Sequence, residues 1–373
     1  MRLRPTRSPR RRVALALAAL MSLPAIGAAQ VDALPSGVVR AASIGPSEQT
    51  QIDAYVAKYA PGLTSGDPDE MRRSRDLLLS PLKGEGFTFA FRRAYGGALW
   101  PTIESLVASD NPFEQLAGMR LAGRVATEQP TGALINLLES EDAGVRVFAA
   151  GRLGLVLETA ISSSTPTISP DTAARAVRGL AERVRADEEI RVADASVRSL
   201  GEATGASPRA LDGVRDIATR ELGDAIGDRL RAARERLSQG QEEMLVALRA
   251  LGLVRIAVAD ANARPSAETA KAAVGAGGDA IAYILARFDA DLIGEDKSVE
   301  VRLLQAAQTT FYFGRQRYAE VTNGDRNIPT PTLDKAFEGP RPRDFRIQAT
   351  GLLGPSATWL GELGFKPDRF IGS

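Results

Sequence analysis

Residues 130–159 read PTGALINLLESEDAGVRVFAAGRLGLVLET, and this stretch decides the fold. Apolar residues recur every three or four positions on both sides of the polar turn Ser140-Glu141-Asp142, which predicts two helices joined by a tight turn. Pro130 suits the first turn of a helix, and the Asp142 carboxylate can cap the N–H groups that open the second helix. The apolar stripe of the second helix consists of Val145, Phe148, Ala149, Leu153, Val156 and Leu157. The stretch therefore predicts an antiparallel helix pair with one core-facing side.

The same unit recurs on both sides of this stretch. Self-similarity at a period of a few tens of residues is typical of stacked repeats, in which each unit buries its apolar side against its neighbours. Upstream, a shift of 32 residues aligns Phe113 with Val145, Ala117 with Ala149, Arg120 with Arg152 and Leu121 with Leu153. Downstream, a shift of 47 residues aligns Val145 with Val192, Leu153 with Leu200 and Gly154 with Gly201.

The shared positions form a recognisable pattern over roughly residues 100–205. It is acidic-x-x-Val-Arg-x-x-Ala-x-x-x-Leu-Gly, and it is carried here by Asp142, Val145, Arg146, Ala149, Leu153 and Gly154. This pattern resembles the HEAT repeats, in particular the HEAT-like bacterial group. The resemblance implies an all-α fold, an α-solenoid of stacked antiparallel helix pairs that form a superhelix, and a role in protein binding.

The remaining chain divides around this array. We expect a HEAT-like solenoid over residues 101–320, preceded by N-terminal capping helices at 47–100 and a disordered linker at 30–46. Prolines at 329, 331, 340 and 342 predict an irregular C-terminal tail over residues 321–373. The apolar residues that could dock this tail onto the solenoid are Trp359, Leu360 and Phe365.

The N-terminal 29 residues predict export. Six arginines precede the apolar run Val13–Ile26, and the small residues Gly27, Ala28 and Ala29 follow it. This order is that of a secretory signal peptide at residues 1–29, cleaved after Ala29, and it places the mature protein in the periplasm or outside the cell. An uncleaved anchor is the alternative, although a membrane span needs about 20 apolar residues. Arg10-Arg11-Arg12 leaves export by the twin-arginine route open.

Composition limits the partners and the chemistry. Removal of the six signal arginines leaves 41 basic and 46 acidic residues, a net charge of −5. A mildly acidic exported chain is a poor binder of nucleic acid or of anionic membranes, so we expect protein partners and no stable membrane insertion. The chain has no cysteine and no histidine, which excludes disulfides and thiolate sites and removes the commonest general base. We therefore expect no cofactor and no enzymatic activity.

Residues 289–300, DADLIGEDKSVE, resemble a calcium-binding loop. Asp289, Asp291, Gly294 and Glu300 occupy loop positions 1, 3, 6 and 12, between two predicted helices. Position 5 is Ile293 where an oxygen ligand is expected, and an acid at 296 replaces the usual apolar residue. The alternative is an acidic turn that caps the following helix.

A second candidate site is aromatic and basic. Phe311, Tyr312 and Arg315 lie in one predicted helix, and consecutive residues point about 100° apart, so the aromatic rings cannot all face one core. They are candidates to bind a partner, and packing against the C-terminal tail is the alternative. The nearby run Gly275-Ala-Gly277-Gly278 lacks the context of a phosphate loop and predicts a turn.

Three functions follow as hypotheses. The leading one is an envelope scaffold that holds a protein partner. The second is a hydrolase or lyase that uses carboxylates alone, because two facing acids suffice for glycoside hydrolysis. The third is a calcium-responsive module built on residues 289–300.

Overall fold

The structure is a computed structural model that describes residues 33–83, 86–163, 165–206, 211, 213–237 and 240–371. The signal peptide predicted at 1–29 lies outside these residues. Within them the chain forms helices and no strands, so the fold is all-α. None of the helices in these ranges is both long and apolar enough to cross a bilayer.

The helices follow one another at short intervals along the chain. They are α1 (Ser36–Val39), α2 (Pro46–Tyr59), α3 (Pro68–Leu79), α4 (Phe89–Val107), α5 (Pro112–Val125), α6 (Glu128–Leu137), α7 (Ala143–Ser162), α8 (Pro170–Ala186), α9 (Ile190–Thr204), α10 (Val214–Arg236), α11 (Gln241–Ala259), α12 (Ala267–Asp289), α13 (Ser298–Thr322), α14 (Leu333–Glu338), α15 (Pro342–Leu353) and α16 (Trp359–Glu362), with the short 3-10 helices η1 (Ala60–Thr64) and η2 (Ser80–Leu82) beside α3.

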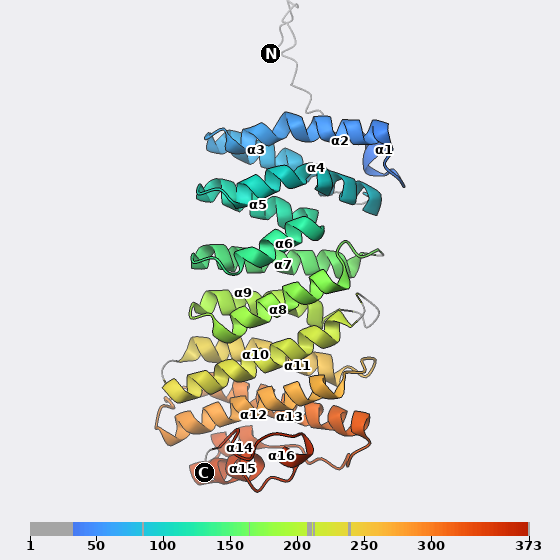
Figure 1. Ribbon diagram of the computed structural model, residues 1–373. Helices are drawn as coiled ribbons and strands as arrows, with labels where there is room; N and C mark the ends of the chain where they lie inside the picture. Colours follow the sequence, from blue (N-terminus) through green and yellow to red (C-terminus); the bar gives the residue numbers. More distant parts are fainter. Residues whose placement is uncertain are drawn as a thin grey trace, which may run out of the picture.

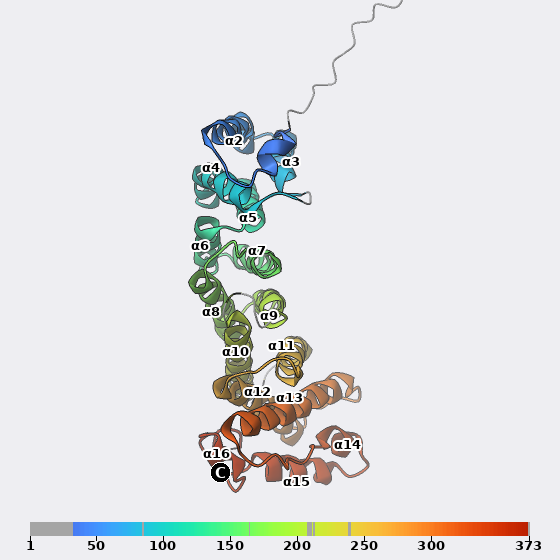
Figure 2. The same ribbon diagram turned by 90° about the vertical axis from the view of Figure 1, so that its right-hand side faces the viewer.

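The helices are stacked in chain order from one end of the molecule to the other (Figure 1). Figure 2 shows two columns, with α4, α6, α8 and α10 in one and α5, α7, α9 and α11 in the other. Within each column the successive helices contact each other, and each helix also contacts its partner in the other column. The buried apolar residues form one continuous core along the stack.

Residues 130–159 form the antiparallel helix pair that their sequence predicts. The pair consists of α6 and α7, joined by a turn at residues 138–142. Asp142 caps α7, because its Oδ1 accepts hydrogen bonds from the N–H groups of Gly144 at 2.6 Å and Val145 at 3.3 Å. Asn111 caps α5 in the same way. Such caps satisfy backbone donors that have no partner within the helix.

The repeated Leu-Gly element has a packing role. Ser199 of α9 donates a hydrogen bond to the carbonyl oxygen of Ala150 in α7, at 2.8 Å. A Cβ atom at Gly154 would lie only 2.7 Å from Ser199 Oγ. The glycine therefore lets two stacked helices approach closely enough for a side chain to bond the neighbouring backbone.

Arginines join successive layers through polar contacts. Arg146 of α7 donates to both carboxylate oxygens of Asp187, at 2.7 and 2.9 Å, and to the carbonyls of Ser140 and Glu141 in the turn before α7. Arg229 of α10 is buried; it donates to both oxygens of Glu243 at 2.7 Å and to the carbonyls of Val184 and Asp187. These are favourable contacts, since charged donors offset unpaired carbonyls at helix ends. We call Arg146 and Arg229 the layer-bridging arginines.

The N-terminal region is more ordered than predicted. The expectation of a disordered linker at 30–46 is wrong for residues 33–46, because α1 forms there and Leu34 and Val38 are buried in the core. The boundary expected near residue 100 also falls inside α4, which continues through Pro101.

The C-terminal tail docks on the last helices, as its apolar residues indicate. It contains α14, α15 and α16, and Trp359, Leu360 and Phe365 are buried. Asp279 of α12 is also buried, and its Oδ2 accepts from Arg231 of α10 at 2.6 Å and from Arg369 of the tail at 2.8 Å. Burial raises the pKa of Asp279 to about 6 against the opposing effect of the two arginines.

The glycines at 275, 277 and 278 do not form a turn. They lie inside α12, which begins at Ala267 and ends at Asp289. A Cβ at Gly277 would lie 2.7 Å from the carbonyl oxygen of Ala307, and one at Gly278 would lie 2.6 Å from the Phe370 ring. Close contact with α13 and with the tail explains these glycines, which have no conformational role.

Candidate partner-binding groove

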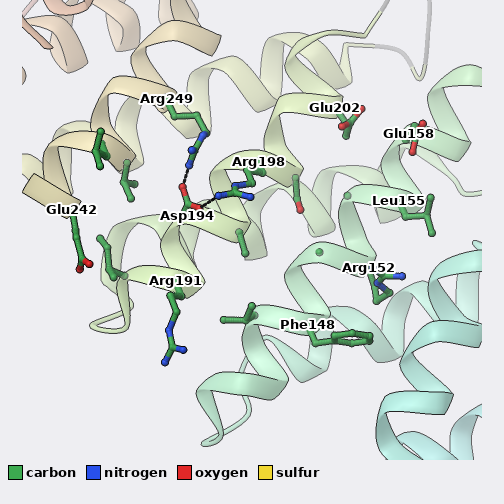
Figure 3. Close-up of a pocket in the computed structure, with 18 residues that line it drawn as sticks. Phe148, Arg152, Leu155, Glu158, Arg191, Asp194, Arg198, Glu202, Glu242 and Arg249 are labelled. Atoms are coloured by element: carbon green, nitrogen blue, oxygen red, sulfur yellow. Dashed lines mark ion pairs between the residues drawn. The ribbon is translucent and has the colours of Figure 1, made fainter. Parts of the chain in front are cut away.

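An open groove crosses three successive layers on the side formed by α7, α9 and α11. It encloses about 790 Å³. Figure 3 shows its side chains, which come from all three helices. We call it the α7–α11 groove. Its lining includes Phe148, Arg152, Leu155 and Glu158 of α7, Arg191, Asp194, Arg198 and Glu202 of α9, and Glu242, Leu245 and Arg249 of α11.

Helical spacing places these residues on one side of each helix. Phe148, Arg152, Leu155 and Glu158 are separated by three or four residues, which is about one helical turn. The buried stripe of α7, which includes Leu153 and Leu157, occupies a different side. One side of the helix therefore builds the core and another lines the groove.

The middle of the groove carries ion pairs between layers. Asp194 pairs with Arg198 on its own helix at 2.6 Å and also contacts Arg249 of α11. Figure 3 shows Asp194 between these two arginines. The side chains of Arg198 and Arg249 are 65% and 40% exposed, so the pairs add little to stability and can exchange with a bound partner.

One end of the groove is acidic. Glu158 and Glu202 lie together there (Figure 3). The pKa of Glu202 is raised, mainly by burial and to a smaller extent by the negative charge of Glu158. Within the described parts of the chain neither carboxylate has a basic partner. Both are exposed and can accept a cationic group from outside.

Apolar surface is interleaved with these charges. Leu245 is 42% exposed, and Leu155 is partly exposed beside the acidic end. At the border of the groove the Phe148 ring lies under two guanidinium groups, with Arg152 at 4.9 Å and Arg120 of α5 at 5.7 Å from the ring centre. The groove therefore combines apolar, acidic and basic groups on one surface.

The aromatic cluster predicted to bind a partner is covered by the tail. Phe311 is buried, and its ring meets Trp359 edge-on at 4.9 Å. The Arg315 guanidinium lies 5.8 Å from the centre of the same Trp359 ring, and burial lowers the pKa of Arg315. Tyr312 is half-buried against Phe313. Packing against the tail, the alternative drawn from the sequence, accounts for Phe311 and Arg315.

The structure does not bring the four calcium-loop residues together. Asp289 accepts a hydrogen bond from Arg346 at 2.7 Å, whereas Glu300 is buried 3.8 Å from Arg287. Asp291 and Gly294 lie in the segment between α12 and α13. Within the described ranges no three acidic side chains are grouped in a way that could hold a metal ion.

Sequence reasoning missed the groove as a site. Its side chains were visible only as the polar sides of amphipathic helices, which are usually solvated. One signal did exist, since the internal alignment places Arg120 on Arg152, and the structure brings both to the same aromatic ring.

Comparison with known proteins assigns no family. No family model matches the chain, and no curated protein matches it. Among solved structures, one described as "Crystal Structure of Engineered Protein" matches with 18% identity and a TM-score of 0.40, over 70% of this chain and 97% of that chain.

Proposed function

We propose that the chain is an exported, HEAT-like α-solenoid that holds a protein partner along the α7–α11 groove. The observation that carries this proposal is the groove, which offers exposed apolar, acidic and basic side chains from three successive layers. Stacked repeats bind in this manner, because a long surface distributes contacts over many side chains. The N-terminal sequence supports export, and the internal repeats support the HEAT-like assignment.

Site-specific photocrosslinking tests the proposal. A photoreactive amino acid would replace Leu155 or Leu245 in the groove, or Arg178, an exposed residue of α8 that does not line it. The full-length gene would be expressed in the native cells. We expect both groove positions to crosslink to the same protein and the Arg178 position to give no such product. Absence of a common product at Leu155 and Leu245 would refute binding in the groove.

The acidic end of the groove favours a second candidate, a hydrolase or lyase based on carboxylates. Retaining and inverting glycosidases need two acids about 5–10 Å apart, one of them with a raised pKa. Glu158 and Glu202 are neighbours, and the pKa of Glu202 is raised. Activity of the purified protein on envelope glycans, lost in both Glu158→Gln and Glu202→Gln, would support this candidate. Wild-type activity in both variants would exclude these two acids as the catalytic pair.

A further inference from the structure

Two arginines at the border of the groove share one aromatic ring. Arg120 of α5 and Arg152 of α7 lie 5.7 and 4.9 Å from the centre of the Phe148 ring. The stem of Arg152 crosses over Gly123 of α5, where a Cβ atom would come within 3.0 Å of its Cδ. Neighbouring layers thus direct two positive charges to one place on the surface.

Neither of these charges is neutralised. Among the residues that the structure describes, Arg120 and Arg152 have no carboxylate partner and donate no hydrogen bond to a carbonyl. The layer-bridging arginines Arg146 and Arg229, in contrast, each bond to one carboxylate and two carbonyls.

Arg152 also carries an unmet donor. Its Nε is buried without a hydrogen-bond partner, and burial together with the nearby Arg120 lowers the pKa of Arg152. An unpaired buried donor is unfavourable, and so are two like charges beside one ring. An anionic group placed beside the two guanidinium groups would offset part of this positive charge.

We propose that Arg120, Phe148 and Arg152 form a subsite for an aspartate or glutamate side chain of a partner segment that lies in the α7–α11 groove. This inference rests on the proposed function. Guanidinium groups bind carboxylates through paired, charge-assisted hydrogen bonds. Because Glu158 and Glu202 lie farther along the same groove, a polyanion would be repelled, and the segment must be acidic at one point only.

The spacing of the two charged ends defines the segment further. Arg152 and Glu158 are six residues apart in one helix, a rise of about 9 Å. An extended chain covers this in about three residues. The segment therefore carries an acidic residue at the Arg120–Arg152 subsite and a basic residue about three positions away, opposite Glu158 and Glu202, with apolar residues between them.

Binding of short peptides tests this arrangement. The probes are the fluorescein-labelled peptides Gly-Glu-Leu-Leu-Lys-Gly and the same peptide with Gln in place of Glu, measured by fluorescence anisotropy on the mature protein. We expect the Glu peptide to bind at least about tenfold more tightly than the Gln peptide. In Arg120→Gln/Arg152→Gln this ratio should fall to about one. Arg178→Gln, at an exposed arginine of α8 that does not line the groove, should leave the ratio unchanged.

Other results would overturn the inference. Equal binding of the two peptides, or a ratio that survives in Arg120→Gln/Arg152→Gln, would show that the subsite does not read a carboxylate. Competition by inorganic phosphate but not by acetate would identify a phosphate site instead. Thermal unfolding followed by circular dichroism verifies that each variant is folded.

Crosslinking separates this inference from the proposed function. Arg120→Gln/Arg152→Gln should lose most of the common crosslinked product at Leu155 and Leu245. If that product forms at wild-type levels in the double variant, the groove binds its partner and the acidic subsite is wrong. If the wild-type protein gives no common product, the proposed function fails first.

Discussion

Replacing Arg229 with methionine should destabilise the middle of the stack without changing its ends. Methionine keeps much of the apolar stem but removes the guanidinium that donates to both oxygens of Glu243 and to the carbonyls of Val184 and Asp187. Loss of one partner of a buried ion pair costs about 3–5 kcal/mol. The Glu243 side chain is 24% exposed and regains some hydration, so the lower end, about 3 kcal/mol, is expected.

Hydrogen exchange read by mass spectrometry is the suitable assay, because it resolves the layers. A loss of about 3 kcal/mol corresponds to roughly a hundredfold faster exchange through opening of the affected layers. Peptides from α8, α10 and α11 should show the acceleration, and peptides from α2 and α4 should not. Arg191→Met, in which the lost side chain is 77% exposed, is the matched control and should leave exchange unchanged.

A second variant separates the charge from the packing. Arg229→Met/Glu243→Leu removes both charges and should recover much of the lost protection, because replacing a whole buried ion pair with apolar residues is often nearly neutral. The reasoning is refuted if Arg229→Met accelerates exchange in α8, α10 and α11 less than about tenfold, which is about 1.4 kcal/mol. It is also refuted if the double variant exchanges as fast as the single one.

Three further predictions concern packing, pH and export. Gly154→Ala should lower the free energy of unfolding by about 1–3 kcal/mol, because the added methyl group is overpacked against Ser199. Gly151→Ala should raise the free energy of unfolding, because its methyl group meets nothing within 4 Å and alanine favours the helix. Urea unfolding of both variants measures the difference. The pKa of Asp279 is about 6 in the folded protein, against 3.8 for an ordinary aspartate. Its ionisation therefore opposes folding above pH 6, and this cost is relieved as the pH falls from 6 toward 4. The unfolding free energy of wild type relative to Asp279→Asn should therefore rise over that range, and a flat difference would contradict it. The protein isolated from the native envelope should begin at Gln30, and a retained Met1 on Edman or mass analysis would rule out cleavage.

The helix pairs of residues 100–205 were predictable because their signals are local. Apolar residues at three- and four-residue intervals define a buried side wherever the partner helix lies, and Asp142 caps the helix that directly follows it. The glycines of α12 misled for the opposite reason. Their usual association with turns is overridden by tertiary contacts, such as that between Gly278 and Phe370.

The groove could not be predicted from local sequence patterns. A polar helix side looks the same whether it faces water or a partner, and the charge balance at Arg152 depends on which residues surround it in space. Arg146 shows this most clearly, since its carboxylate partner is Asp187, 41 positions farther along the chain. The repeat pattern includes Arg146, but the pattern does not reveal its carboxylate partner, which only the stacking of the layers brings into contact.

The layer-bridging arginines also bear on how such a chain can lengthen. Arg146 and Arg229 share one arrangement, in which the guanidinium bonds two backbone carbonyls at a helix boundary and one carboxylate. A tandem copy of a unit with this arrangement brings a donor to one border and acceptors to the other. Duplication within the gene would therefore create a new junction whose buried polar groups are already matched. The stack can therefore gain layers by duplication without leaving buried polar groups unmatched at the new junction.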